Sequence, residues 1–169
     1  AEYALLAAGA YWDIRKPDPD NKWNNQAPLP EGWEILTQFD QSGSGENANI
    51  GYGGFSARVY RNKSTQEVVI SYGGTEFEGN WLGTGLDFKT GNIPLAIGLF
   101  GEQAARAAIL YEDVRRSLHT SSITFTGHSL GGGLASLMSI WANRPAYVFA
   151  QAPFEPSTKP KPFIDFVDS

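Results

Sequence analysis

Residues 123–135 read ITFTGHSLGGGLA, and this stretch decides the fold predicted for the chain. Its first four residues are β-branched or aromatic, which is typical of a buried strand, and residues 130–141 carry apolar side chains at helical spacing. Between them, residues 127–131 read GHSLG, a G-x-S-x-G pattern. In this strand-turn-helix context the pattern is typical of a nucleophile elbow, which holds a reactive serine at the end of a buried strand.

Two glycines make such a tight turn possible. Gly127 and Gly131 lie two residues before and two residues after Ser129, where a Cβ atom would make the strand and the departing helix collide. The start of the helix directs backbone N–H groups toward an oxyanion formed at the serine. His128 directly precedes Ser129, and a side chain at that position points away from the serine. We therefore expect His128 to be a packed structural residue.

The composition indicates a globular protein and excludes several kinds of chemistry. The 169 residues are 41 % hydrophobic and 13 % aromatic, so residues 1–169 are predicted to form a single α/β domain. The net charge of −5 and the scattered Lys and Arg residues argue against nucleic acid as a partner. Because there is no cysteine, a thiol nucleophile, a disulfide and a cysteine-ligated metal are excluded, and we expect no metal or cofactor.

The N-terminal half is predicted to begin with a helix and to continue with strands. The helix is expected to end near Asp13, and the Pro-, Asp- and Asn-rich residues 15–32 are expected to form a loop. Residues 33–39 have the composition of a strand. Residues 54–60 and 68–72 predict a β-hairpin at the antiparallel edge of the sheet, with its second strand running inward.

The C-terminal half supplies the helices and the parallel part of the sheet. Residues 76–98 are expected to be a loop with short helical pieces, and residues 100–118 predict a long helix. After the G-x-S-x-G stretch and its helix, residues 146–150 predict another apolar strand, which crossover geometry makes parallel to the preceding one.

The chain resembles the class 3 lipases, the fungal-lipase-like branch of the α/β-hydrolases. The resemblance rests on GHSLGG at residues 127–132, on GGT at residues 73–75, and on NWL at residues 80–82 with LD at residues 86–87. It implies an α/β-hydrolase fold, a three-layer sandwich whose mostly parallel sheet has an antiparallel N-terminal hairpin.

The resemblance also implies roles for three residues. Ser129 matches the nucleophile, and Thr75 and Leu130 match the residues whose backbone N–H groups form the oxyanion hole. The alternative for Thr75 is a turn residue that ends its strand. Two positions depart from the family: Gly73 stands where arginine is usual, so the support that this arginine gives the loop is missing, and Asn80 replaces the usual aspartate.

The general base and the acid are harder to place. In this family the catalytic acid and histidine lie well beyond the strand matched by residues 146–150. His119 precedes the strand that leads to Ser129, so it is expected about 20 Å away, at the opposite end of the sheet. Asp165 and Asp168 are weak stand-ins for the acid. We therefore expect a truncated hydrolase, apparently incomplete at its C-terminus, that is completed by the remainder of the hydrolase domain or by a companion chain.

The leading interpretation is a serine carboxylic-ester hydrolase, a lipase or esterase that cleaves lipid-like esters through an acyl-enzyme on Ser129. One alternative is a phospholipase, in particular a bacterial toxin effector. Another is a catalytically inactive binding domain, if the chain is naturally complete. Residues 91–101, GNIPLAIGLFG, are either a lid hinged on glycines that touches a lipid surface transiently, or simple core packing. The resemblance favours a secreted or effector-delivered protein.

Overall fold

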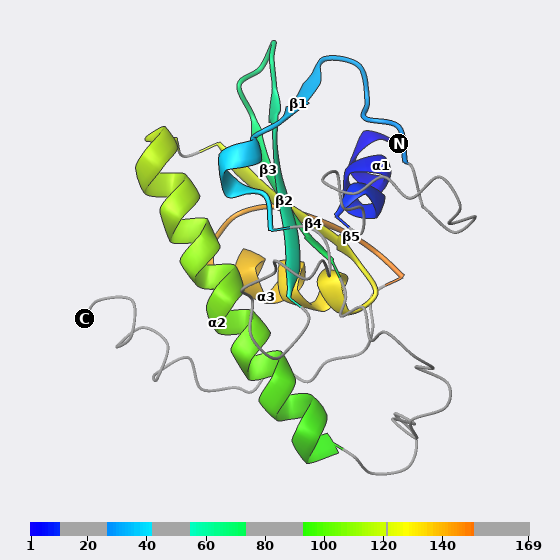
Figure 1. The fold of residues 1–169 in the computed structure, drawn as a ribbon, viewed down its shortest axis with the longest axis vertical. Helices are drawn as coiled ribbons and strands as arrows, with labels where there is room; N and C mark the ends of the chain where they lie inside the picture. The colour runs from blue at the N-terminus through cyan, green and yellow to red at the C-terminus, as the bar shows by residue number, and fades with distance from the viewer. Residues whose placement is uncertain (11–26, 42–54, 74–92, 121, 151–169) are drawn as a thin grey trace.

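The described part of the chain alternates between strands and helices. The structure, a computed structural model, describes residues 1–10, 27–41, 55–73, 93–120 and 122–150, with only the helical backbone for residues 93–100 (Figure 1). Its elements are α1 (Glu2–Gly9), β1 (Trp33–Ile35), the 3-10 helix η1 (Thr37–Phe39), β2 (Ser56–Asn62), β3 (Val68–Gly73), α2 (Ile93–Leu118), β4 (Ile123–His128), α3 (Leu130–Ala142) and β5 (Ala146–Phe149).

The five strands form one mixed sheet in the order β1-β2-β3-β4-β5. Strand β2 pairs antiparallel with β1 and β3, whereas β3, β4 and β5 run parallel to one another. The predicted hairpin is therefore present as β2 and β3, and its second strand lies at the centre of the sheet. The hairpin does not form the edge, because β1 pairs with the outer side of β2.

Helices cover both faces of this sheet (Figure 1). Helix α1 packs on β3, β4 and β5, while α3 packs on the same strands and is itself in contact with α2. The alternation along β3 separates the two faces. Val68 and Ile70 belong to the large core cluster that contains α2 and α3 residues, and Val69 belongs to a smaller cluster with Leu6 of α1. The fold is therefore of the α/β-hydrolase type, with three layers and a mixed sheet.

The strand predicted over residues 33–39 is too long. Strand β1 ends at Ile35, and the chain then turns into η1. This turn places Leu36 and Phe39 on one side, where both are buried in the large core cluster. In a continued strand these two side chains would point to opposite faces, because side chains alternate along a strand. Burial of both residues therefore decides against the longer strand.

The N-terminal helix and the long helix both have other ends in the structure than predicted. Helix α1 ends at Gly9, before the expected end near Asp13, which lies outside the described residues. Helix α2 begins at Ile93, so the expectation of a loop over residues 76–98 is wrong for its last part. Pro94 does not prevent this, because proline is tolerated in the first turn of a helix, where its missing N–H has no partner to lose. With 26 residues, α2 is about 39 Å long.

The segment interpreted as a lid coincides with the start of α2. Residues 93–101 are the first turns of that helix, and Gly101 lies inside it, so it is not a hinge between two elements. Figure 1 shows this end of α2 reaching beyond α3. A role as a lid stays a prediction, and it would require the helix end, not a separate loop, to move.

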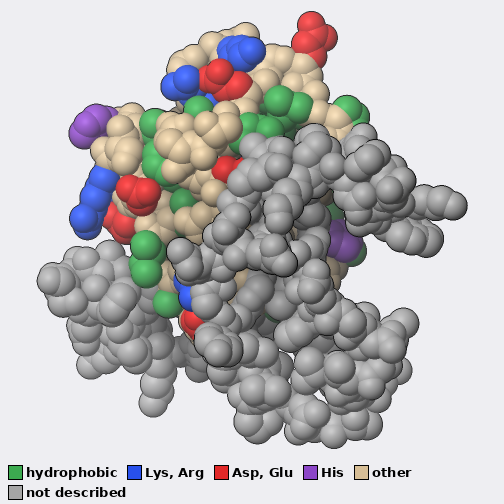
Figure 2. All heavy atoms as spheres, in the orientation of Figure 1, with side chains coloured by type: hydrophobic (Ala, Val, Ile, Leu, Met, Phe, Trp, Pro, Cys, Tyr) green, Lys and Arg blue, Asp and Glu red, His purple; other side chains and the backbone are tan. Residues whose placement is uncertain are grey.

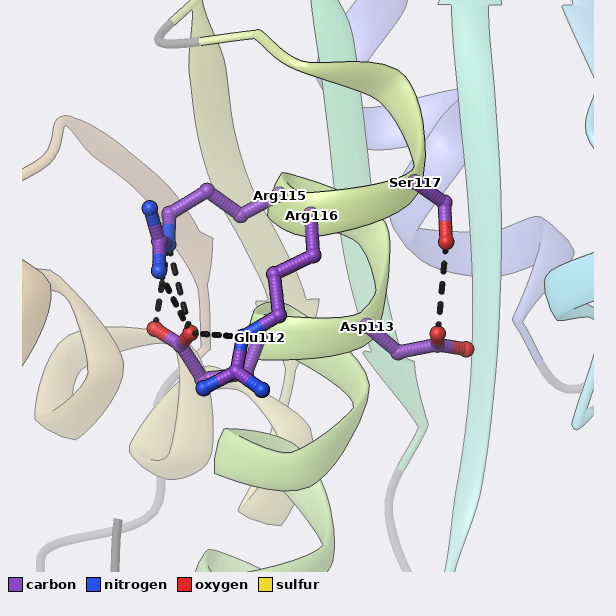
Figure 3. Close-up of polar contacts among 5 residues, drawn as sticks. All are labelled: Glu112, Asp113, Arg115, Arg116 and Ser117. Carbon is purple, nitrogen blue, oxygen red and sulfur yellow. Dashed lines mark hydrogen bonds and ion pairs between the residues drawn. The ribbon is translucent and has the colours of Figure 1, made fainter. Parts of the chain in front are cut away.

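The opposite end of α2 carries a cluster of charged side chains (Figure 3). Glu112 accepts hydrogen bonds from Arg115 at 2.8 Å and from Arg116 at 3.3 Å. The hydrogen bonds from Arg115 lower the pKa of the Glu112 carboxyl. Both arginines lie in the last turn of α2, where positive charge complements the helix dipole. Because such pairs are solvent-exposed, they contribute little to stability. We assign them no role beyond stabilising the end of α2.

Buried tyrosines make the fold sensitive to high pH. Burial raises the pKa of Tyr60 from its ordinary value of 10.0 to about 12, although the nearby Arg58 acts in the opposite direction. Burial also raises the pKa of Tyr72, whose hydroxyl donates to the Ala107 carbonyl at 3.1 Å. The Tyr60 hydroxyl donates to the Leu6 carbonyl at 3.2 Å, which joins β2 to α1.

We expect the protein to lose stability as the pH rises above 10. The folded pKa of Tyr60 is raised, so its contribution is fully present below pH 10.0 and is lost as the pH approaches 12. Each such tyrosine adds a slope of about 1.4 kcal/mol per pH unit in that window. Urea unfolding of the full-length protein between pH 8 and 11.5 measures this slope. Tyr60→Phe should reduce it, and an equal slope in wild type and variant would contradict the assignment.

Candidate active site

Ser129 links β4 to α3 in a strained backbone conformation. Its φ is 55° and its ψ is −122°, a region that residues with a side chain rarely adopt and that costs about 1–3 kcal/mol. The backbone is held on both sides, because Ser129 N–H donates to the Phe149 carbonyl at 3.1 Å and the Ser129 carbonyl accepts from Gly133 N–H at 3.2 Å. The side chain does not cap α3, although Ser129 occupies the N-cap position. The hydroxyl is therefore not used to satisfy the helix.

The turn depends on close contacts between backbones. A Cβ atom at Gly127 would overlap the Gly131 carbonyl group and lie 2.8 Å from Gly132 N, so the expected close approach of strand and helix is present. A Cβ atom at Gly131 would overlap the carbonyl oxygen of Tyr72 and lie 2.9 Å from the carbonyl carbon of Gly73. The second contact is with β3, the neighbouring strand, and sequence reasoning did not find it.

We call residues 127–131 the Ser129 turn. It lies at the carboxyl end of β4, between the neighbouring parallel strands β3 and β5. In open α/β sheets this end of the strands is where ligands bind. Leu130 is the first residue of α3, and backbone N–H groups in the first turn of a helix have no partner within the helix and carry partial positive charge. The structure thus brings a strained serine and the positive end of a helix together.

Other predicted site residues lie outside the part of the chain that the structure describes. They are Thr75, Asn80, Asp165 and Asp168. Gly73, the last described residue before Thr75, ends β3 directly beside Gly131. The strand that leads to Thr75 therefore reaches the Ser129 turn, and the role of Thr75 stays a prediction.

Neither histidine is buried beside the serine. His119 directly follows α2, is exposed, and has a φ of 48°, as expected for a residue that ends a helix. All six residues of β4, about 20 Å of strand, lie between His119 and Ser129. His128 is exposed, so the expectation that it is packed is wrong. The reason is its place: His128 is the last residue of β4, and the first five residues of that strand are buried whereas the last one reaches the surface.

The described surface carries mixed charges and few large apolar side chains. Figure 2 shows acidic, basic and hydrophobic side chains interspersed over the described part of one face. Among the described residues, no group of three His, Cys, Asp or Glu side chains could hold a metal ion. No described helix is long and apolar enough to cross a membrane. Among the side chains that the structure describes, the exposed large hydrophobic ones are Leu29, Ile109, Ile140 and Tyr147.

A mixed sheet with helices on both faces, and a strained serine between a central strand and the following helix, defines the chain as an α/β-hydrolase-like protein. The chain belongs to the phospholipase-like family, because the family model of the Tle-like phospholipase domain matches residues 2–164. The match confirms the prediction of a lipase- or phospholipase-like hydrolase, and it does not single out the class 3 branch. None of the curated proteins compared with the chain matches it.

Proposed function

We propose that the protein is a serine phospholipase that cleaves a carboxylic-ester bond of a phospholipid through an acyl-enzyme on Ser129. The family supplies the lipid class of the substrate. The observation that carries the choice of bond is the strained Ser129 turn, because a serine fixed beside the N–H groups of a helix start suits attack on a carbonyl carbon. In this proposal the Ser129 turn is the nucleophile elbow, and the resemblance to class 3 lipases supports the same assignment.

The proposed reaction is an acyl transfer in two steps. The Ser129 Oγ attacks the ester carbonyl carbon while its proton passes to a general base, and the carbonyl oxygen becomes an oxyanion. Backbone N–H groups of Leu130 and Thr75 stabilise this oxyanion, each by about 3 kcal/mol. Collapse breaks the ester bond and releases a lysophospholipid, which takes the proton from the base. Water, deprotonated by the same base, then attacks the acyl-enzyme, and the bond to Ser129 Oγ breaks as the base returns the proton to that oxygen and the fatty acid leaves.

We propose that the general base and its acid partner come from beyond residue 169 or from a companion chain. The support is the position of His119 at the amino end of β4, far from the serine. Without a base, the oxyanion hole alone supports only residual catalysis. A binding domain without catalysis is the competing proposal, and reaction of Ser129 with a covalent probe in the full-length protein separates the two.

We also propose that the start of α2 contacts the lipid surface. Helix α2 connects the parallel strands β3 and β4, so its first turns lie toward the end of the sheet that carries Ser129. The sequence of these turns, IPLAIGLFG over residues 93–101, is apolar throughout. Such a helix end can enter the interface of a lipid aggregate through burial of apolar side chains, so binding does not depend on electrostatic attraction to anionic headgroups. Use of the protein as a toxin effector would change the target membrane and leave this chemistry the same.

Products of phospholipid cleavage test the proposed bond. The full-length protein is incubated with phosphatidylglycerol vesicles, and the lipids are identified by mass spectrometry. We expect free fatty acid and lysophosphatidylglycerol in equal amounts, because the carboxylic ester is cleaved. Diacylglycerol or phosphatidic acid as the product would show cleavage at the phosphate and would contradict an acyl-enzyme. Ser129→Ala is the control that removes the proposed nucleophile.

A further inference from the structure

We propose that Arg58 is a positioning residue for Ser129. Its guanidinium holds the end of α1, and the end of α1 supports the end of β3, against which the Ser129 turn is built. This inference rests on the proposed function of Ser129 as the nucleophile. Arg58 lies in β2, two strands away from the serine, and takes no part in the chemistry itself.

Arg58 is a buried charge with defined partners. Only 1 % of its side chain is exposed, and its Nε lies 3.3 Å from the Asp40 carboxylate, which is also buried. Its Nη1 donates to the Gly9 carbonyl at the end of α1, at 2.7 Å. Buried ion pairs often contribute no net stability compared with apolar side chains, so stability alone gives no reason for an arginine at this position. An apolar residue could not donate the hydrogen bond that Arg58 makes to the end of α1.

Helix α1 needs such an anchor. It has only eight residues and no basic residue in its last turn. Helices this short are marginal by themselves, and their ends are stabilised by positive charge. Arg58 supplies that charge from another strand. Ser56, two residues earlier on the same face of β2, donates to the Ala10 carbonyl at 2.6 Å. The last carbonyl groups of α1 are thus held by neighbouring residues of β2.

The anchored end of α1 rests on the last residue of β3. Gly73 pairs with Ser56 in the sheet, and a Cβ atom at Gly73 would lie 3.0 Å from the Ser56 Cβ and 3.3 Å from the Ala10 carbonyl oxygen. On the opposite face, Gly131 of the Ser129 turn approaches the carbonyl groups of Tyr72 and Gly73. The end of β3 is therefore clamped between α1 and the Ser129 turn.

The end of β3 leaves little room beside Gly73. A side chain at position 73 would be crowded, because Ser56 and Ala10 would have to shift by a few tenths of an ångström to admit its Cβ atom. The guanidinium of Arg58 reaches this end of α1 from β2. If Arg58 is lost, α1 can shift away from β3. The end of β3 is then held less firmly against Gly131, and the strained Ser129 turn can relax. Arg58 lies two strands away from Ser129 and takes no part in binding the substrate in this proposal, so kcat should fall while KM stays nearly constant.

The test compares two variants that each remove one β2 contact with α1, in the full-length protein. Arg58→Met removes the hydrogen bond to the Gly9 carbonyl, and Tyr60→Phe removes the hydrogen bond to the Leu6 carbonyl but keeps the aromatic ring against Gly9. We expect Arg58→Met to lower kcat for a soluble short-chain ester, and the rate of Ser129 labelling by a fluorophosphonate, by about 10- to 100-fold. Tyr60→Phe should change both less than twofold. Arg58→Lys should recover part of the rate, because its ammonium can still donate to Gly9.

Equal labelling rates in wild type and folded Arg58→Met would overturn the inference, as would equal losses in Arg58→Met and Tyr60→Phe. If Arg58→Met does not fold, Ser56→Ala replaces it, since it removes the bond to Ala10 and keeps the ion pair of Arg58 with Asp40. We expect a loss of about threefold or more for Ser56→Ala, and a wild-type rate would overturn the inference.

Hydrogen exchange separates this inference from the proposed function. Amides of residues 129–133 should exchange faster in Arg58→Met, or in Ser56→Ala, and not in Tyr60→Phe. If wild-type protein is not labelled at Ser129, the proposed function fails, and the exchange rates alone then decide whether Arg58 holds the Ser129 turn. Unchanged exchange in the Arg58→Met and Ser56→Ala variants would overturn the inference.

Discussion

Ser129→Ala is expected to remove phospholipid hydrolysis and covalent labelling together in the full-length protein. The loss in kcat should reach about 10⁶-fold, the scale seen when a serine nucleophile is deleted, because oxyanion stabilisation and binding alone leave little catalysis. Release of fatty acid from phosphatidylglycerol vesicles measures the rate, and a fluorophosphonate probe measures labelling. A variant that retained more than a few per cent of the wild-type rate would exclude Ser129 as the nucleophile.

Ser129→Gly is compared with Ser129→Ala, because both remove the hydroxyl and only glycine also relieves the backbone strain. Glycine adopts a positive φ without cost, so it should relieve the strain at φ 55° and raise the stability by about 1 kcal/mol. Both variants should be inactive, and only the glycine variant should unfold at a higher temperature than wild type. If alanine and glycine gave the same stability, the strained conformation would not exist in solution.

Gly131→Ala is expected to cause the largest loss of stability from a single methyl group. The new Cβ would overlap the Tyr72 carbonyl oxygen, which is part of a central strand and cannot move aside without breaking the sheet. We expect a loss of about 3 kcal/mol or more, which for a chain of this size lowers the unfolding temperature by about 10 °C. Thermal unfolding followed by circular dichroism measures it.

Gly101→Ala provides the control for this experiment. Gly101 also lies in a helix, and a Cβ atom there would meet nothing within 4 Å. The same substitution should therefore stabilise the protein by about 0.5–1 kcal/mol, through the higher helix propensity of alanine. A loss of stability in Gly131→Ala no larger than the change in Gly101→Ala would show that β3 and the Ser129 turn are not in close contact.

Much of the fold could be predicted from local patterns. The strand, turn and helix around Ser129, the hairpin of β2 and β3, and the apolar strand β5 were all predicted from the spacing of apolar residues and glycines. These patterns succeed because a buried strand and an amphipathic helix each leave a periodic trace in the sequence. The prediction of a strand over residues 33–39 failed because it rested on composition, which suits a strand. Burial of Leu36 and Phe39 on the same side requires a turn instead.

The candidate site was predictable to the same extent. Ser129, Leu130 and the two glycines of the turn follow from a short motif in its strand-turn-helix context, because the chemistry of the turn lies within five consecutive residues. The exclusion of His119 also followed from chain order, since a strand of known rise separates it from the serine. The exposure of His128 did not follow, because a pattern along one strand does not tell which neighbouring element covers its last residue.

From the sequence alone one could read the local geometry at Ser129, because torsion angles and periodicity are properties of neighbouring residues. Only the tertiary structure decided what holds that geometry in place. β1 lies outside the hairpin, the Gly131 backbone packs on β3, and Arg58 reaches the end of α1. Each of these contacts joins segments far apart in the chain, and a contact between distant segments leaves no spacing in the sequence from which it could be inferred.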